Sequence, residues 1–161
     1  MSEDGLIGLL EAQHDQLEGM LDRLPTLMGS LREQAFLELR QLIAVHEAIE
    51  QQLVHPRAKA DEPGAADSRV AEELAAADLL TALERMDIES TEFETTFRGL
   101  QHALREHAEA EELTEFTALQ DAFDDADLAR ARQAVERVES GAAALAEPFA
   151  SIHEQAVREL G

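Results

Sequence analysis

The chain has 161 residues, 45% of them hydrophobic, and only four prolines, which suits a single all-α domain with one core. Its 35 acidic side chains outnumber 13 basic ones, and the net charge of −22 disfavours nucleic acids and anionic membrane surfaces as partners. Cysteine is absent, which excludes disulfides, zinc–thiolate clusters and thiol nucleophiles, so any bound metal needs nitrogen and oxygen ligands.

The sequence carries no recognisable export signal or membrane span. Its first ten residues, MSEDGLIGLL, have no basic flank and too short an apolar run for a signal peptide. No later stretch is apolar over the length that a bilayer requires. We therefore expect a cytoplasmic protein.

Side chains at steps of three and four predict a first helix that fades near Pro25 and Gly29. Its stripe consists of Leu10, His14, Leu17, Leu21, Leu24 and Met28. The capping-box spacing of Ser30 and Glu33 predicts the start of a second helix, which we expect Pro56 to close. The second stripe consists of Leu39, Leu42, His46, Glu50 and Leu53.

Residues 56–67, PRAKADEPGAAD, are predicted to form the longest loop. A third helix is expected from about Ser68 to Asp87, with an inner face made of Glu73, Ala76, Leu80 and Leu83. Thr91 and Glu94 have the spacing of a second capping box, which predicts a fourth helix. The fourth stripe consists of Phe93, Phe97, Leu100, Leu104, His107 and Glu111.

A final stripe predicts one further helix over about residues 127–160, kinked near Pro148. It comprises Leu128, Ala131, Val135, Val138, Ala142, Leu145, Phe149 and Ile152. Because the first two helical pairs have short connections, their helices should be antiparallel neighbours. The expected fold is an all-α, up-down four-helix bundle over about residues 6–120 with an additional C-terminal helix, in a single domain of residues 1–161.

The spacing His-x-x-x-Glu occurs at four of the six histidines, so the spacing alone is weak evidence of a site. His46 with Glu50, and His107 with Glu111, continue the apolar stripes of their helices, whereas His102 falls off its stripe and should be solvated. A carboxylate turned into a core costs several kcal/mol unless it is paired or binds a metal. Two inward pairs of this kind predict a buried metal site.

The depth of these residues in the bundle gives a second test. In an antiparallel hairpin, residues equidistant from the turn lie at the same level, and His14 and His46 are symmetric about Ser30. Symmetry about Ser90 places His107 opposite Glu73. The matching is good to about one helical turn, so both hairpins should bring ligand-type side chains to one level of the bundle.

These residues resemble those of the hemerythrin-like family, the histidine–histidine–glutamate cation-binding bundles. The family pattern is a histidine on helix one, His-x-x-x-Glu followed by proline on helix two, a histidine on helix three, and His-x-x-x-Glu on helix four. His14, HEAIEQQLVHP and HAEAEELTEF match three of these four elements, over roughly residues 6–120. The resemblance implies two iron ions, with Glu50 and Glu111 bridging them and an oxo or hydroxo group completing the site.

The departure from the family lies in helix three, where Glu73 stands in place of the expected histidine. A carboxylate there would favour Fe(III) and lower the reduction potential, which disfavours reversible oxygen carriage. Three alternatives stay open. Glu73 binds the second iron, Glu73 does not bind and that iron is labile, or His153 of the last helix replaces it.

Two functions from other classes compete with this interpretation. A ferritin-like di-iron protein needs Glu-x-x-His on two helices, and only Glu11 with His14 fits, so iron storage of that kind is disfavoured. A metal-free acidic bundle could act as a regulatory or interaction module, and chelators would not change its stability.

His55, beside Pro56 at a predicted helix end, is expected at the surface.

The sequence therefore predicts a non-haem di-iron protein that reacts with or senses dioxygen, peroxide or nitric oxide, with oxidase- or peroxidase-type activity an open question. The expected ligands are His14, His46, Glu50, Glu73, His107 and Glu111. No surface pattern indicates a macromolecular partner or an oligomeric state.

Overall fold

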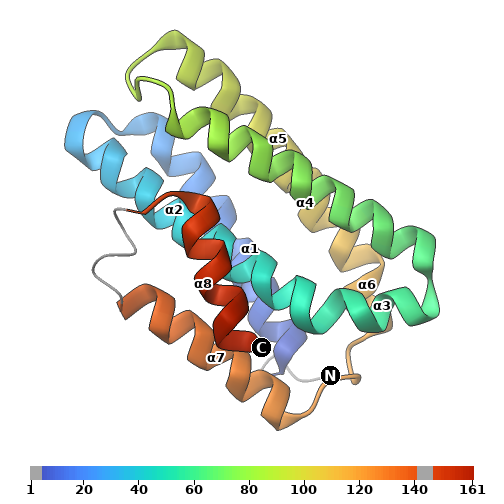
Figure 1. Ribbon diagram of the computed structural model, residues 1–161. Coiled ribbons are helices and arrows are strands. Elements are labelled where there is room, and N and C mark those ends of the chain that lie inside the picture. The colour runs from blue at the N-terminus through green and yellow to red at the C-terminus, as the bar shows by residue number, and fades with distance from the viewer. Residues whose placement is uncertain (1–4, 141–146) are drawn as a thin grey trace.

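The computed structural model describes residues 5–140 and 147–161, and every regular element in these ranges is helical (Figure 1). The α-helices are α1 (Leu6–Arg23), α2 (Gly29–Ile49), α3 (His55–Asp61), α4 (Pro63–Glu84), α5 (Thr91–Leu113), α6 (Glu115–Ala118), α7 (Asp125–Ser140) and α8 (Phe149–Leu160). A 3-10 turn, η1 (Leu24–Thr26), follows α1, and a π-helical segment, η2 (Glu50–Val54), joins α2 to α3. The all-α prediction is confirmed for these ranges.

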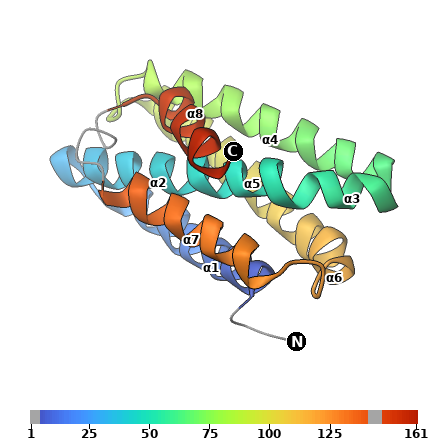
Figure 2. The ribbon, with the colours of Figure 1, turned by 60° about the horizontal axis from the view of Figure 1, so that its bottom comes forward.

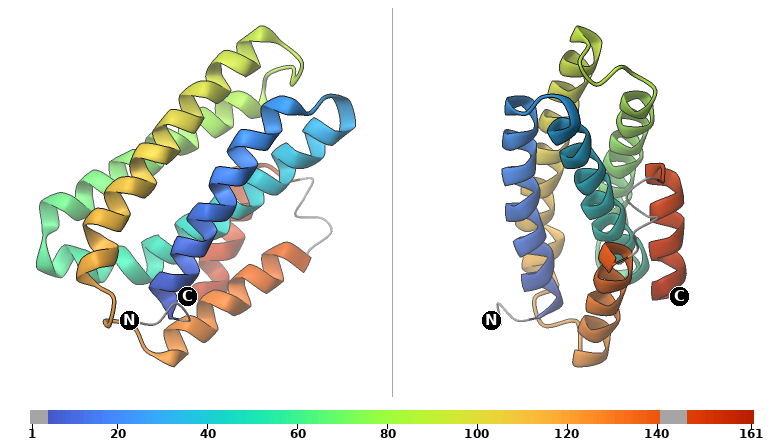
Figure 3. Two further views of the ribbon diagram at one scale, coloured as in Figure 1. Left: turned by 180° about the vertical axis from the view of Figure 1, so that it is seen from behind. Right: turned by 90° about the vertical axis from the view of Figure 1, so that its left-hand side faces the viewer.

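Helices α1, α2, α4 and α5 run up and down side by side and form the predicted four-helix bundle (Figure 3). The turn between α1 and α2 and the turn between α4 and α5 lie at the same end of the bundle. Phe36, Phe93 and Phe97 pack against one another near that end, with both α5 rings almost fully buried. Met28, expected on the first stripe, is 74% exposed because it lies in the turn beyond η1.

The C-terminal region forms two helices, so the prediction of one kinked helix over about 127–160 is wrong. Helices α7 and α8 pack against each other and against α2 on the outside of the bundle (Figure 2). Pro148 stands at the N-cap of α8, where its missing N–H leaves no hydrogen bond unmade. Ala142 and Leu145 of the predicted stripe lie outside the described residues.

Helix α2 is covered on nearly all sides, because the bundle lies on one side of it and α7 and α8 lie on the other. Every residue from Leu39 to Ile49 is buried, including the polar side chains of Arg40 and Gln41. Gln41 donates a hydrogen bond from Nε2 to the carbonyl oxygen of Val138 in α7. A helix in this position needs apolar or paired residues all round, which explains its weak amphipathic pattern.

The second helix does not end at Pro56, contrary to the prediction. The chain widens into the π-helical segment η2 and continues as α3, with Pro56 in the first turn of α3. Proline in a helix lacks the N–H that would bond to the carbonyl four residues back and its ring clashes with that carbonyl. One π turn relieves this clash without ending the helix.

The predicted loop over residues 56–67 is helical as well. Glu62 alone separates α3 from α4, and Pro63 takes the first position of α4, where an N–H would have no intrahelical partner. Helix α4 therefore begins five residues before the predicted start at Ser68 and ends at Glu84 rather than near Asp87. The tight α3–α4 connection brings His55 and Glu73 within reach of each other.

The two predicted capping boxes do not form, and both helices begin in other ways. Helix α2 begins at Gly29, whose φ of +58° suits glycine, and its N–H donates to Glu89 Oε1, while Ser30 lies inside the helix. Helix α5 is capped by Ser90, not Thr91, with Ser90 Oγ accepting from the N–H of Phe93.

Among the described residues, no helix combines the length and apolar composition that crossing a membrane requires.

Candidate metal centre

The six expected ligands all lie in the core. His14 comes from α1, His46 from α2, Glu50 from the first position of η2, Glu73 from α4, and His107 and Glu111 from α5. Glu50 and Glu111 are 0% exposed, and none of the six exceeds 7%. Ionisable side chains reach this degree of burial when they are paired or bind a metal.

Four of these residues form a first group at one level of the bundle. His14, His46, Glu50 and Glu111 offer ligand atoms that lie within 4.8 Å of one another. His14 Nε2 is 3.1 Å from His46 Nε2 and 3.2 Å from Glu111 Oε1. His46 Nε2 is 3.2 Å from Glu50 Oε1. Two ligands bound at about 2.1 Å to one cation are roughly 3.0–3.4 Å apart, so these separations suit a shared ion.

A second group overlaps the first. Glu50, Glu73 and His107 offer ligand atoms within 4.8 Å of one another. His107 Nε2 lies 3.9 Å from Glu50 Oε1 and 3.2 Å from Glu111 Oε1. Glu50 belongs to both groups, and Glu111 Oε1 lies within 3.2 Å of both His14 and His107. Each group could hold a metal ion, with the two carboxylates between them.

Hydrogen bonds on the far side of two rings fix which nitrogen is free. His46 Nδ1 is 2.7 Å from Gln13 Oε1, and His107 Nδ1 is 2.8 Å from Glu72 Oε1, so each Nδ1–H donates to an oxygen. In the neutral form of each ring, the lone pair is then on Nε2, which faces the carboxylates. This outer hydrogen bond is typical of metal-binding histidines, because it orients the ring and sets its tautomer.

His14 has the same orientation. Its Nδ1 faces Glu112 Oε1 at 3.4 Å, and its Nε2 points at His46 Nε2. In the tautomer with hydrogen on Nε2, His14 donates to His46 Nε2 or to Glu111 Oε1. In the tautomer with hydrogen on Nδ1, the lone pairs of both Nε2 atoms are available to one cation between the rings.

Several buried polar atoms of the cluster have no hydrogen-bond partner. They are both oxygens of Glu50, Oε1 of Glu73, Oε2 of Glu111, Oε1 of Glu115 and Nε2 of His107. Unpartnered buried polar atoms cost about 1–3 kcal/mol each and are rare in folded proteins. Because these atoms gather in one place and are of ligand type, a bound cation explains them together.

The metal-free cluster redistributes protons among its carboxyl groups. Burial, then the charge of Glu111, raises the pKa of Glu50 well above its ordinary value. Burial opposes ionisation of Glu111 too, but its contacts with the side chains of Glu50, His107 and His14 prevail and lower the pKa of Glu111 well below its usual range. The two neighbouring carboxyls thus hold one proton between them, which a metal ion would displace.

The pKa values of His46 and His107 are shifted in opposite directions by their surroundings. Burial and the neighbouring His14 lower the pKa of His46 to about 3, so this ring is neutral and ready to bind. Burial would lower the pKa of His107 too, but the carboxylates of Glu111 and Glu72 raise it to about 9. His107 therefore carries a proton that metal binding must remove.

Glu73 lies opposite His107, at the level that symmetry about Ser90 predicts. It is 1% exposed, and its Oε2 accepts a hydrogen bond from His55 Nε2 at 2.7 Å. Its other oxygen has no partner. The carboxylate that replaces the family's histidine is therefore oriented by His55 and retains one oxygen for a metal.

His55 is a part of the cluster that the sequence reading missed. It is 5% exposed rather than at the surface, and it donates from Nε2 to Glu73 and from Nδ1 to Glu115 Oε2 at 2.9 Å. Burial lowers its pKa, but these two carboxylates raise it to about 10. The prediction of a surface position is wrong because the chain stays helical through Pro56. Glu115 had a visible signal, since it continues the four-residue spacing of His107 and Glu111.

Two other histidines lie outside the cluster. His102 and Glu106 form an exposed pair at 3.2 Å, as predicted for a solvated face. His153 Nε2 is 2.9 Å from Gln51 Oε1, and among the described residues it belongs to no candidate metal-binding group. Its placement gives no support to His153 as a replacement for Glu73.

A small cavity adjoins the imidazoles. It has a volume of about 10 Å³ and is bounded by His14, His46, His107, Gln13 and Glu47 together with apolar side chains. That space fits roughly one water-sized molecule. Burial, then the charge of Glu73, raises the pKa of Glu47 well above its ordinary value, so this side chain is a neutral acid beside the cavity.

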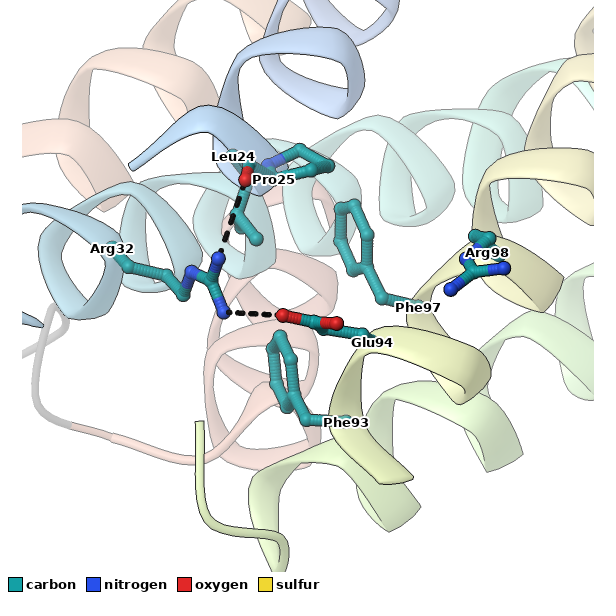
Figure 4. Close-up of a pocket in the computed structure, with 7 residues that line it drawn as sticks. All are labelled: Leu24, Pro25, Arg32, Phe93, Glu94, Phe97 and Arg98. Carbon is teal, nitrogen blue, oxygen red and sulfur yellow. Dashed lines mark hydrogen bonds and ion pairs between the residues drawn. The ribbon is translucent and has the colours of Figure 1, made fainter. Parts of the chain in front are cut away.

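A larger cavity of about 190 Å³ lies at the other end of the bundle (Figure 4). Arg32 crosses it, donating to the carbonyl oxygens of Leu27, Ile88 and Pro25 and pairing with Glu94 at 3.7 Å. These contacts tie the two turns of the bundle together. With Arg32 and Arg98 as neighbours, the single carboxylate in its lining is poorly placed to hold a cation.

Comparison with known proteins agrees with this geometry. The family described as Hemerythrin, the hemerythrin HHE cation binding domain, matches residues 5–119, which is more than half of the chain. No curated protein and no solved structure matches the chain. The matched range contains all six expected ligands as well as His55 and Glu115. The chain belongs to the hemerythrin HHE cation-binding domain family.

Proposed function

We propose that this protein is a non-haem di-iron protein that reacts with or senses dioxygen, peroxide or nitric oxide. The observation that carries the proposal is the pair of overlapping groups, in which imidazole Nε2 atoms on both sides face the carboxylates of Glu50 and Glu111. Imidazole and carboxylate together, without thiolate, suit iron.

The ligands divide between two positions. His14 and His46 would hold one iron, His107 and Glu73 would hold the other, and Glu50 and Glu111 would be shared. Two irons held in this way supply one-electron redox changes and coordination positions for a small oxidant. The hydrogen bonds from His46 to Gln13 and from His107 to Glu72 keep the rings oriented toward the ions.

Glu73 biases this chemistry. An anionic ligand in place of a neutral imidazole stabilises Fe(III) relative to Fe(II) and lowers the reduction potential. The hydrogen bond from His55 holds the Glu73 carboxylate in place. The site suits reaction with an oxidant, or sensing of one, better than reversible oxygen carriage.

The small cavity supports a diatomic or similarly small ligand. Its volume of about 10 Å³ leaves no room for an organic substrate beside the imidazoles. Glu47 can hold a proton at its carboxyl group next to this space. An enzyme would turn over peroxide or a reductant with dioxygen, whereas a sensor would bind once and change conformation.

A metal-free regulatory bundle explains the cluster less well. It would leave the buried oxygens of Glu50, Glu73 and Glu111 without partners, at a cost of about 1–3 kcal/mol each.

Iron quantitation tests the proposal. After anaerobic reconstitution with ferrous iron, we expect at least two irons per chain, two of them held by the groups that share Glu50. Glu50→Ala should lose both because Glu50 belongs to both groups, while Glu106→Ala, an exposed control on α5, should keep both. A wild-type protein that takes up no iron would contradict the proposed function.

A further inference from the structure

Another cavity, of about 90 Å³, is lined by residues of α3, the start of α4 and the short helix α6. Its polar lining consists of Asp61, Glu62, Thr114 and Glu115. Asp61 and Glu62 are exposed, whereas Glu115 is 4% exposed. All charged side chains that line this cavity in the described part of the chain are acidic, so it attracts cations and repels anions.

Glu115 connects this cavity to the buried cluster. Its Oε2 accepts a hydrogen bond from His55 Nδ1 at 2.9 Å, and its Oε1 is buried without a partner. A carboxylate oxygen in that situation lacks the hydrogen bonds that water would supply. A bound cation would compensate it.

The ligand-type atoms continue inward from Glu115. His55, Glu111 and Glu115 offer ligand atoms that lie within 4.8 Å of one another. Glu111 also belongs to the group of His14 and His46. The three residues therefore form a bridge of donor atoms from the acidic cavity to the inner positions.

We propose that His55, Glu111 and Glu115 form an outer cation site, which takes a divalent cation from the acidic cavity before it passes to the inner pair. This inference rests on the proposed function, because Glu111 is shared with an inner iron position. Binding replaces one hydrogen on His55 with the cation, and the proton leaves to solvent. Oxygen donors and one imidazole suit ferrous iron and its divalent substitutes.

Cobalt(II), followed by its visible absorption and by equilibrium dialysis, tests the outer site under anaerobic conditions. The wild-type protein should bind three ions per chain and Glu115→Gln should bind two. Glu109→Gln, which removes the same charge from an exposed position on α5, should still bind three. We also expect loading of the inner pair to slow about tenfold in Glu115→Gln, since the local attraction for cations is reduced.

A second variant guards against a folding defect. Asp61→Asn combined with Glu62→Gln changes only exposed side chains at the cavity. It should slow loading and still bind three ions. Two ions in both the wild type and Glu115→Gln, with equal loading rates, would overturn the outer site and leave the inner pair standing. A wild type that binds no ion would overturn the inner pair and the outer site together.

Discussion

The Nε2 atoms of His14 and His46 lie 3.1 Å apart in the core of the bundle, although the residues are 32 positions apart in the sequence. The hydrogen bond from His46 Nδ1 to Gln13 Oε1 leaves no hydrogen on His46 Nε2. The lone pair of His46 Nε2 is therefore available to a cation, or to the Nε2–H of His14 when no cation is bound. The outer hydrogen bonds should therefore control metal affinity.

Gln13→Leu should weaken metal binding about 10–100-fold, because it removes the hydrogen bond that sets the His46 tautomer. Competition with a chelator of known affinity gives the measurement. Gln16→Leu, an exposed change on α1, is the matched control and should leave affinity unaltered. Equal affinities for both variants would show that Gln13 does not orient the ring.

Glu50→Leu should stabilise the metal-free protein while abolishing metal binding. The substitution removes two buried oxygens without partners and puts an apolar side chain of similar size in their place. Replacing buried ionisable clusters by packed apolar residues adds about 1–4 kcal/mol to the free energy of unfolding in favourable cases. Urea unfolding of the two chelator-treated proteins measures the difference.

The surface offers a control for this stability change. Glu38→Leu, an exposed position on α2, should alter the free energy of unfolding by less than about 0.5 kcal/mol. A Glu50→Leu protein less stable than the metal-free wild type would mean that the carboxyl group is well accommodated without metal.

Metal binding should release protons, and its affinity should rise with pH. In the metal-free protein His107 has a pKa raised to about 9, and the raised pKa of Glu50 keeps that carboxyl protonated near neutrality. Because the metal-free state holds more protons than the bound state, higher pH favours binding, by about tenfold per pH unit for each proton released.

Calorimetry in buffers of different ionisation enthalpy counts these protons. His46 should contribute none, since its pKa is lowered to about 3. An affinity that stays constant between about pH 6 and about pH 8 would contradict the proton inventory of the cluster.

Glu73→His restores the ligand type that the family pattern has on helix three, and it should raise the reduction potential of the iron pair. Exchanging the anion for a neutral imidazole removes part of the preference for Fe(III). A tenfold change in that preference corresponds to roughly 60 mV for one electron. A redox titration measures the shift in reduction potential. The same titration of Glu72→His, which changes the hydrogen-bond partner of His107 next to Glu73, serves for comparison. An unchanged potential would place Glu73 outside the coordination sphere.

The level of the site could be predicted from the sequence because it depends on regular helices. The apolar stripes set the inner faces of α1, α2 and α5, and symmetry about the two turns sets the depth of His14, His46 and Glu73. These inferences depend only on the helical period and on the number of residues between each position and its turn. In the structure, His14, His46 and Glu73 all belong to the candidate metal-binding groups.

The extension of the cluster through His55 and Glu115 could not be predicted in the same way. Local rules read Pro56 as the end of a helix, whereas packing in the bundle holds the chain helical through a π turn. The burial of the outer face of α2 could not be predicted from the sequence either. Its burial depends on α7 and α8, whose docking leaves no periodic signal within α2 itself.

Electron paramagnetic resonance of the oxidised, iron-loaded protein most directly tests the claim that two irons share Glu50 and Glu111. Bridged ferric ions couple magnetically, so a sample with about two irons per chain should give almost no signal from the ferric ions. Isolated ferric ions give a strong signal. A two-iron sample with the full signal of uncoupled ferric ions would contradict the shared carboxylates.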